Sequence, residues 1–356
     1  MAPDPNRRPL RIGVDAHALG RRATGNERFV GNVLRELRSM SDHDFVLFFT
    51  DAHVARAWEA DGWRVRIMRP AHPSVRIPIV LPRLAREERL DVLFVQYTAP
   101  RDPGCPVVTV VHDVSFAEHP DWFSATERRW MPRTIPATMR RAARVVTVSA
   151  FSRDEIVRLY GIPPERIVVA HDGVDPRLAT AQPRPASAPP GDYLLSVGTA
   201  SPRKNVAMLR GAFARARAAG LDASLVVAGP GHAPGGERVL ATGWIDDATL
   251  SGLMQHAAAL CYPSRYEGFG LPPVEAMSVG TPALVADIPV MLETVGDAAV
   301  RLPAGDEEAW AEAMTRIVTD QAWRAELAAR GRQRAAGFTW RDCAAEVLRA
   351  VEEAAG

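Results

Sequence analysis

The sequence predicts an α/β protein with two domains, each built around a parallel β-sheet. Its 356 residues are long for one domain and sufficient for two of ordinary size, and 47% of them are hydrophobic. Short apolar runs alternate with helical segments in two series, which is typical of parallel βαβ units. Between the series, residues 176–191 are rich in Pro and Ala without periodicity, so they are expected to be an interdomain linker. These observations place the domains at 1–175 and 190–338, followed by a helical segment in 339–356.

The first series consists of near-continuous apolar runs, which suit strands that are covered on both faces. A loop containing Gly20 and Gly25 is expected after the first strand, followed by a helix in which apolar residues such as Phe29 and Val33 repeat with a helical period. A strand, a glycine loop and a helix in succession can form an anion-binding unit. The expected strands of this series begin near Leu10, Asp44, Trp63, Asp91, Pro106 and Arg144.

The second series ends in the motif around which the chain is organised. Its expected strands are YLLSVG, SLVVAG, RVLATGW and ALCYP, with helices over Val206 to Ala219 and Thr249 to Ala257. A loop with two glycines then leads to a helix that is predicted to begin at Leu271-Pro272-Pro273, because proline suits a first helical turn. Glycines let backbone N–H groups approach a ligand, here at the positive end of a helix dipole. The loop therefore predicts an anion site, with phosphate as the expected anion.

Two carboxylates, Glu267 and Glu275, lie on either side of this loop. Acidic side chains would repel a phosphate unless they have another task, and accepting hydrogen bonds from ribose or sugar hydroxyls is such a task. Either acid alone would be explained as a favourable charge near a helix N-terminus. The pair with Gly-Phe-Gly between them instead predicts a site that holds both phosphate and hydroxyl groups.

The segment SRYEGFGLPPVEAMSVGTP resembles the signature of the retaining glycosyltransferases of the GT-B fold, of the family four type that includes bacterial mannosyl- and glucosyltransferases. Three further matches are the family's HD motif at His112-Asp113, its glycine-to-Arg-Lys-Asn loop from Gly198 to Asn205, and its glycine-rich turn at TGNERF. That turn has one glycine here, Gly25, where the family usually has two. The resemblance implies two Rossmann-like domains that face across a cleft. The first would be the acceptor side, the second would bind the nucleotide sugar, and the last helix would bridge back to the first.

The resemblance also implies a role for each matched residue. In the family the first Glu of the motif lies against the donor sugar and the second binds the ribose, which carries over to Glu267 and Glu275. The cations Arg203 and Lys204 would neutralise the diphosphate leaving group, as preorganised cations can when a sugar–phosphate bond breaks. His112 would contact the donor sugar near the reacting carbon. The expected catalytic residues are therefore His112, Arg203, Lys204 and Glu267. The expected donor-binding residues are Gly25, Gly198, Arg203, Lys204, Gly268, Phe269, Gly270, Leu271 and Glu275.

The expected reaction transfers a sugar from a nucleoside diphosphate sugar to an acceptor hydroxyl with retention of configuration. GDP-mannose is the first choice of donor because GFGLPPVEAM resembles the mannosyltransferase branch. A UDP-sugar, for transfer of glucosyl or N-acetylglucosaminyl type, is the alternative within the enzyme class. A catalytically silent nucleotide-sugar-binding protein is the alternative from another class. No cofactor or metal is expected, and the acceptor is expected to be a glycan, a lipid-linked sugar or a small molecule.

Charge is distributed unevenly along the chain. The formal net charge is +1, but 28 Arg and 22 acidic residues precede Gly191, and 15 basic and 20 acidic residues follow from there. The basic half lacks a basic run and aromatic interleaving, so nucleic acid is not an expected partner, whereas an anionic small molecule or a lipid surface fits it. The basic segment from Thr126 to Arg144 leaves peripheral membrane contact open, although two prolines in it argue against a regular amphipathic helix. Lys204 is the only lysine in the sequence, which indicates a site that needs a compact ammonium unless its survival is chance.

The sequence predicts a cytoplasmic protein, with the inner face of the membrane as the alternative location. No segment approaches the about 20 apolar residues of a membrane-spanning helix, and the first residues lack the apolar region of a signal peptide. The three cysteines, Cys105, Cys261 and Cys343, are too few and too widely spaced for a disulfide framework or a zinc site.

Overall fold

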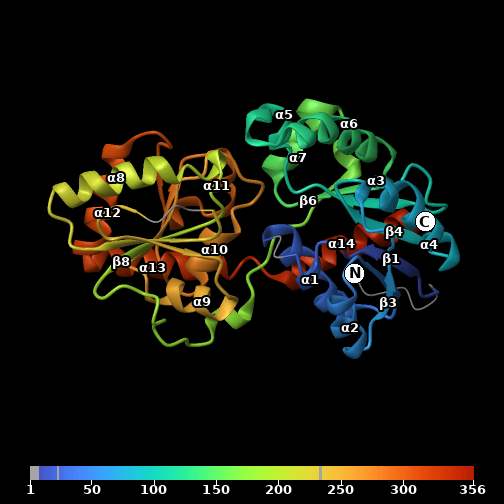
Figure 1. Ribbon diagram of the computed structural model, residues 1–356, viewed down its shortest axis with the longest axis horizontal. Coiled ribbons are helices and arrows are strands. Elements are labelled where there is room, and N and C mark those ends of the chain that lie inside the picture. Colours follow the sequence, from blue (N-terminus) through green and yellow to red (C-terminus); the bar gives the residue numbers. More distant parts are fainter. Residues whose placement is uncertain (1–7, 22–23, 232–234) are drawn as a thin grey trace. The chain divides into compact units, whose positions relative to one another are not determined.

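The computed structural model describes residues 8–21, 24–231 and 235–356, which form two compact units (Figure 1). Unit 1 contains the chain up to Asp172 together with Trp340–Gly356, and unit 2 is Gly173–Thr339. The chain therefore passes between the units at 172–173 and 339–340, whereas the sequence places the domain boundaries at 175 and 190.

Unit 1 is built around a seven-stranded parallel sheet with the strand order β3-β2-β1-β4-β5-β6-β7. Each apolar run of the first predicted series forms a strand, and most of the strand residues are buried because helices cover both faces. The strands are β1 Arg11–Asp15, β2 Asp44–Phe49, β3 Arg64–Ile67, β4 Val92–Gln96, β5 Val107–Val110, β6 Arg144–Thr147 and β7 Ile167–Val169.

The helices of unit 1 lie on both sides of this sheet, with α5, α6 and α7 on one side and α1, α2 and α14 on the other (Figure 1). Residues of α4, α6 and α7 share one apolar core with β2, β4, β5 and β6. The helices are α1 Thr24–Met40, α2 Ala52–Ala60, α3 Pro73–Val75, the π-helical turn Arg76–Val80, α4 Leu81–Glu87, α5 Ser115–Glu118, α6 Ala125–Arg141, α7 Ala150–Tyr160 and α14 Trp340–Ala355, with short 3-10 turns at Pro120–Trp122 and Pro164–Arg166.

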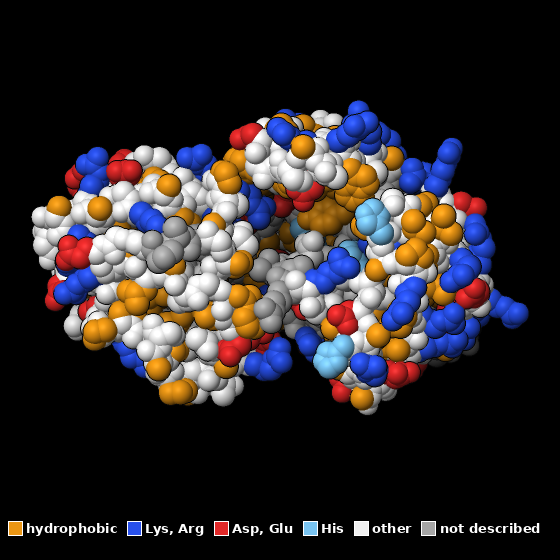
Figure 2. Space-filling model, viewed as in Figure 1, with side chains coloured by type: hydrophobic (Ala, Val, Ile, Leu, Met, Phe, Trp, Pro, Cys, Tyr) orange, Lys and Arg blue, Asp and Glu red, His pale blue; other side chains and the backbone are white. Residues whose placement is uncertain are grey.

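Helix α6 spans most of the basic segment, in which two prolines argued against a regular amphipathic helix. The helix is continuous through Pro132 and Pro136 and starts with a capping box, in which Ser124 and Glu127 satisfy each other's backbone N–H groups. Its first two turns are exposed and include Trp130, and Figure 2 shows arginine side chains over this part of unit 1. Peripheral membrane contact stays a prediction. No helix in the described ranges is long and apolar enough to span a membrane.

Helix α14 returns to unit 1, as the resemblance implies. Its first residue, Trp340, meets Phe29 of α1 edge-on with ring centroids 6.3 Å apart. Near its end, Glu353 accepts a hydrogen bond from Arg144 Nε of β6 at 2.9 Å. The helix has an apolar face that needs a partner, and α1 together with β4 to β7 provides it.

Unit 2 contains a six-stranded parallel sheet with the order β10-β9-β8-β11-β12-β13. The sequence predicts its first four strands but not the last two, which are only four and three residues long. The strands are β8 Tyr193–Val197, β9 Ser224–Ala228, β10 Val239–Gly243, β11 Ala259–Tyr262, β12 Ala283–Ala286 and β13 Val300–Leu302. The helices are α8 Val206–Ala218, α9 Asp247–His256, α10 Leu271–Ser278, α11 Pro289–Thr294, α12 Glu307–Thr319 and α13 Gln321–Ala335, with 3-10 turns at Pro176–Ala179, Pro202–Lys204 and Gly296–Ala298.

The Pro/Ala-rich stretch 176–191 is part of unit 2, so its interpretation as an interdomain linker is wrong. Gln255 of α9 donates from Nε2 to the carbonyl oxygens of Leu178 and Thr180, at 2.7 and 2.8 Å. The same side chain accepts from the backbone N–H of Gln182 at 2.9 Å. One glutamine thus fixes the backbone of a segment that has no periodicity of its own.

Candidate functional site

The predicted phosphate loops follow two neighbouring strands of unit 2. Strands β9 and β10 lie on one side of β8, and β11, β12 and β13 on the other, so the strand order reverses between β8 and β11. Open α/β sheets bind their ligands at the carboxyl ends of the strands at such a point. The loop after β8 carries Arg203 and Lys204, and the loop after β11 carries Glu267. The backbone N–H of Arg265 donates to the carbonyl oxygen of Arg203 at 2.9 Å and joins the two loops directly.

Lys204 is held between two side chains from the β11 loop. Its Nζ lies 2.5 Å from Oε1 of Glu267 and 2.6 Å from the hydroxyl of Tyr262, and 4.7 Å from the centre of the Tyr262 ring. Burial alone would raise the pKa of Glu267, but the charges of Lys204 and Arg203 outweigh it and lower that pKa to about 2. Burial and the neighbouring carboxylate raise the pKa of Tyr262 well above its usual range. The cluster is therefore an ionised carboxylate, an ammonium and a neutral phenol.

Gly198 makes room for the stem of Lys204. A Cβ on Gly198, which has a φ of +150°, would lie 3.2 to 3.4 Å from three methylene carbons of the lysine. Farther along the loop, Asn205 adopts a left-handed conformation, which Asn tolerates better than most residues, and its Nδ2 donates to the carbonyl oxygen of Ala304 at 2.7 Å. These features fix the lysine side chain near the end of β8.

The second loop leads into α10, which begins at Leu271 as the sequence predicts. Gly270 caps the helix with a φ of +89°, and a Cβ there would lie 2.3 Å from Cε of Met291. Residues 266–271 are buried, and Phe269 packs edge-on against Phe338 with ring centroids 5.3 Å apart. The backbone N–H groups of 268–271 therefore lie at the positive end of α10, in a fixed loop. Glu275, on the same helix, is 3% exposed.

His112 and Gly25 belong to unit 1. His112 lies two residues beyond the end of β5, and its Nε2 is 3.2 Å from Oε1 of Gln96, the last residue of β4. Phe29 meets the imidazole edge-on at a centroid distance of 4.9 Å, and Tyr97 lies 5.7 Å from it. Burial lowers the pKa of His112 to about 4, against a smaller opposite effect of Asp113, so this imidazole is neutral at physiological pH.

Gly25 lies in the first turn of α1 and not in the loop before the helix, which corrects the expectation. The loop turns at Gly20, whose φ is +79° and whose N–H donates to Oε1 of Glu27 at 2.7 Å. This bond ties Gly20 to the first turn of α1, and the helix begins earlier than the glycine spacing suggests. Gly25 is exposed, and a Cβ there would meet no atom within 4 Å. Residues 22 and 23 of the predicted loop lie outside the described residues.

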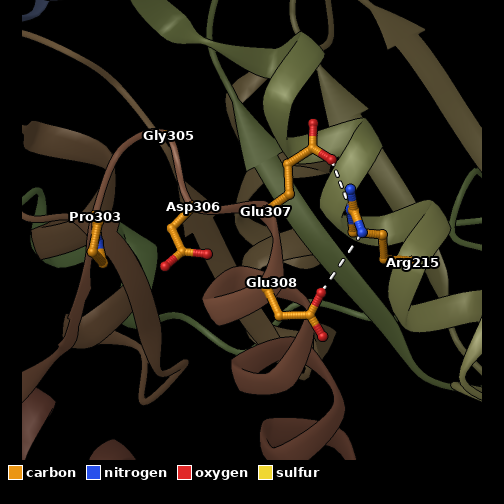
Figure 3. A pocket seen from close by; sticks show the side chains of 6 residues that line it. All are labelled: Arg215, Pro303, Gly305, Asp306, Glu307 and Glu308. Atoms are coloured by element: carbon orange, nitrogen blue, oxygen red, sulfur yellow. Dashed lines mark hydrogen bonds and ion pairs between the residues drawn. The ribbon is translucent and has the colours of Figure 1, made fainter.

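A surface pocket of unit 2 contains none of the predicted site residues (Figure 3). Its charged lining consists of Asp306, Glu307 and Glu308 with Arg215, which is 2.9 Å from Glu307 and 3.7 Å from Glu308. With three carboxylates and one cation, the pocket carries a net negative charge, which makes it a poor site for a phosphate.

Sequence reasoning missed Tyr262 beside Lys204 and Gln96 beside His112, which lie within hydrogen-bond distance of these predicted site residues. Each is the last residue of a strand, and each is distant in sequence from its partner. Their position at the carboxyl end of a predicted strand is the one signal that could have identified them.

Comparisons with known proteins agree with this architecture. Residues 23–178 match the family described as Glycosyltransferase Family 4, and residues 180–334 match the family described as Glycosyl transferases group 1. The O-antigen chain mannosyltransferase B of Escherichia coli is 31% identical over 273 residues, which cover 69% of this chain and 70% of that protein. The O-antigen chain mannosyltransferase RfbU of Salmonella typhimurium is 29% identical over 220 residues, which cover 58% and 59%.

Among solved structures, Anabaena Alr3699/HepE in complex with UDP and glucose has a TM-score of 0.75 at 16% identity, covering 96% of this chain and 99% of that one. Two parallel-sheet units of this kind define a glycosyltransferase of the GT-B fold, in which a hexosyl group is transferred. The chain belongs to glycosyltransferase family 4.

Proposed function

We propose that this enzyme transfers a mannosyl group from GDP-mannose to an acceptor hydroxyl with retention of configuration and without a metal ion. The observation that carries the proposal is the contact of Lys204 with Glu267 at the carboxyl ends of β8 and β11. It combines a cation for a diphosphate with a carboxylate for sugar hydroxyls in one cluster. The two relatives named as O-antigen chain mannosyltransferases support mannose as the sugar and a glycan as the acceptor.

The leaving group determines what the cations do. When the bond between the anomeric carbon and the phosphate oxygen breaks, both electrons stay on that oxygen, and Lys204 with Arg203 stabilises the new charge. The N–H groups of 268–271 contribute in the same way. The acceptor oxygen bonds to the anomeric carbon on the face that the phosphate leaves, and its proton passes to the departing phosphate oxygen. Atoms and charge then balance without a protein acid or base.

The two acids and the histidine have separate roles in this proposal. Glu267 stays ionised, because its pKa is lowered to about 2, and it accepts hydrogen bonds from the transferred sugar and stabilises positive charge that develops at the anomeric carbon. Glu275 accepts hydrogen bonds from the ribose. His112 contacts the donor sugar as a neutral imidazole.

The decisive experiment measures product formation from several nucleotide sugars after a thermal-stability screen has shown which of them bind. A ligand at a hundredfold its dissociation constant adds about 2.7 kcal/mol of stability, so binding is readily seen. We expect GDP-mannose to give the largest shift and turnover, with an unchanged rate in EDTA. The anomeric configuration of the product, measured by NMR, should equal that of the donor.

Other results would change the proposal in defined ways. Turnover of UDP-glucose but not GDP-mannose would establish a glucosyl-type enzyme, an alternative that the UDP and glucose in the Anabaena structure support. Loss of activity in EDTA with rescue by magnesium would exclude the metal-free mechanism. Tight binding without turnover of any donor would establish the silent binding protein.

A further inference from the structure

The carboxyl end of β4 carries buried polar groups beside His112. Gln96 is the last residue of β4 and pairs in register with Val110 of β5, and Thr98 lies two residues farther on. Gln96 is 5% exposed and Thr98 is 8% exposed. Because β4 and β5 are neighbours, these side chains and His112 belong to the same edge of the sheet, where α/β folds bind ligands.

Two of these polar atoms have no partner in the described part of the chain. Oε1 of Gln96 faces Nε2 of His112 at 3.2 Å, but Nε2 of Gln96 and Oγ1 of Thr98 are buried and make no hydrogen bond to any described residue. A buried donor that lacks a partner is destabilising, so such groups normally meet water or a ligand. Gln96 and Thr98 therefore offer hydrogen bonds that the fold does not use.

The carboxylates nearby already have partners. Asp113, next to His112, accepts from the backbone N–H and the hydroxyl of Ser115, at 2.9 and 2.6 Å. Asp15, at the end of β1 next to β4, lies 2.6 Å from Arg76 and 2.9 Å from His17, and all but the histidine are almost fully buried. The contact with Arg76 brings opposite charges together, while the amide, the hydroxyl and the imidazole at β4 and β5 are neutral. A neutral set of donors and acceptors suits hydroxyl groups better than it suits an anion.

We propose that Gln96 and Thr98, together with His112, form a subsite in unit 1 that binds the hydroxyl groups of a sugar. The amide nitrogen of Gln96 donates to a hydroxyl oxygen, and the Thr98 hydroxyl donates or accepts. This inference rests on the proposed function, since the sugar is one that the enzyme transfers or extends. The hydroxyls can come from the donor sugar or from the acceptor, and the experiment distinguishes these sources.

The first experiment observes the Gln96 side chain directly. The chain has five glutamines, so protein labelled with ¹⁵N in its glutamine side chains gives few NH₂ signals. The signal that disappears in Gln96→Met is the signal of Gln96. The labelled wild-type protein is titrated separately with methyl α-D-mannoside, GDP-mannose, UDP-glucose and GDP. We expect the Gln96 signal to shift with a ligand that carries a hexose and not with GDP.

The ligand that causes the shift identifies the source of the hydroxyls. A shift with methyl α-D-mannoside alone shows that the subsite binds an acceptor-like sugar, and a shift only with a nucleotide sugar shows that it binds the donor sugar. No shift with any sugar, or an equal shift with GDP, overturns the proposal. The Gln96 amide and the Thr98 hydroxyl would then form hydrogen bonds with water. The readout needs no turnover. An enzyme that turns over none of the nucleotide sugars therefore contradicts the proposed function, while this titration still decides the subsite.

The second experiment compares Thr98→Val with Thr109→Val. Thr109 is fully buried in β5, beside Val95, and its hydroxyl also has no partner among the described residues. Both substitutions keep the shape and remove an unpaired hydroxyl, so neither should lower the melting temperature. We expect Thr98→Val to raise KM for the sugar-bearing substrate about five- to tenfold, as the loss of one hydrogen bond does, and Thr109→Val to leave it unchanged. Equal kinetics in the two variants overturn the role of Thr98.

Discussion

Lys204 and Glu267 form an ion pair with Nζ 2.5 Å from Oε1, although 63 residues separate them in the sequence. The pair joins the loops after β8 and β11, and Tyr262 is its third member. The positions of the cation and the carboxylate are therefore fixed by the fold before a substrate binds, which is what electrostatic catalysis requires.

Replacing Lys204 tests whether the site needs an ammonium or only a positive charge. Gly198 and Tyr262 enclose the lysine side chain, and the wide planar guanidinium of Lys204→Arg would not fit the same space. We expect Lys204→Arg to lower kcat/KM about a hundredfold through misplacement of the diphosphate. Lys204→Ala should lose about a thousandfold, because the stabilising charge itself is gone. Near wild-type kinetics of Lys204→Arg would mean that the solitary lysine is an accident of composition.

Substitutions of Glu267 and Glu275 should differ in their effects on GDP affinity. If Glu275 holds the ribose, Glu275→Gln should weaken both GDP and GDP-mannose about tenfold or more, as the loss of a charged hydrogen bond does. Glu267→Gln should lower turnover and leave GDP affinity unchanged, since GDP lacks the transferred sugar. Isothermal titration with GDP and initial rates with GDP-mannose measure the two effects. Equal losses of GDP affinity in both variants would contradict this division.

The buried His112 should make unit 1 less stable in mild acid. Its pKa is about 4 in the folded protein, below the ordinary value of 6.5, so folding favours the neutral form. The resulting stability is complete above pH 6.5 and is lost as the pH falls toward 4, by at most about 3 kcal/mol. Glu267 adds a separate loss in unit 2, between pH 4.5 and about 2.

Urea unfolding at a series of pH values checks the histidine effect. His112→Gln should flatten the dependence between pH 6.5 and 4, whereas a substitution of the exposed His53 by Gln should leave it as in the wild type. A wild-type unfolding free energy that stays constant across this range would contradict a buried neutral imidazole.

Gly270 should tolerate no side chain, for two reasons that a control can separate. Gly270→Ala puts a Cβ at a φ of +89° and 2.3 Å from Cε of Met291. Gly220 has a φ of +100° but open space around it, so Gly220→Ala carries the backbone cost alone, about 1 kcal/mol. We expect Gly270→Ala to cost about 2–4 kcal/mol and to weaken GDP binding, because the loop before α10 must move. Equal destabilisation in both variants would show that the contact with Met291 is unimportant.

Local patterns were sufficient for much of the fold. The apolar runs became strands, and the Pro-Pro step at Leu271 marked the start of α10, because both signals act through neighbouring residues. Strand β13 has only three residues, whereas β12 is as long as the predicted β11, so length does not explain why β12 was missed. The fixed course of 176–191 depends on hydrogen bonds to Gln255, which is distant in the sequence and which local propensity does not include.

Contacts within the candidate site were harder to predict than its loops. The motif spacing indicated Lys204 and Glu267, but the contact between them depends on β8 and β11 being neighbours in the sheet. Tyr262 and Gln96 have no spacing signal, since each meets a partner that follows a different strand. Gly25 was assigned to a loop because its residue type favours turns, yet α1 begins at Thr24 and includes it.

The return of α14 to unit 1 has a consequence for the order in which the protein folds during synthesis. Unit 2 is continuous in sequence, so its core can close as soon as residues 173–339 have left the ribosome. Unit 1 lacks the helix that covers α1 and β4 to β7 until residues 340–356 follow. One apolar face of its seven-stranded sheet therefore stays uncovered while the whole of unit 2 is translated. In this interval aggregation and chaperone binding compete with folding, and a stalled or truncated chain would leave a folded unit 2 attached to an unfinished unit 1.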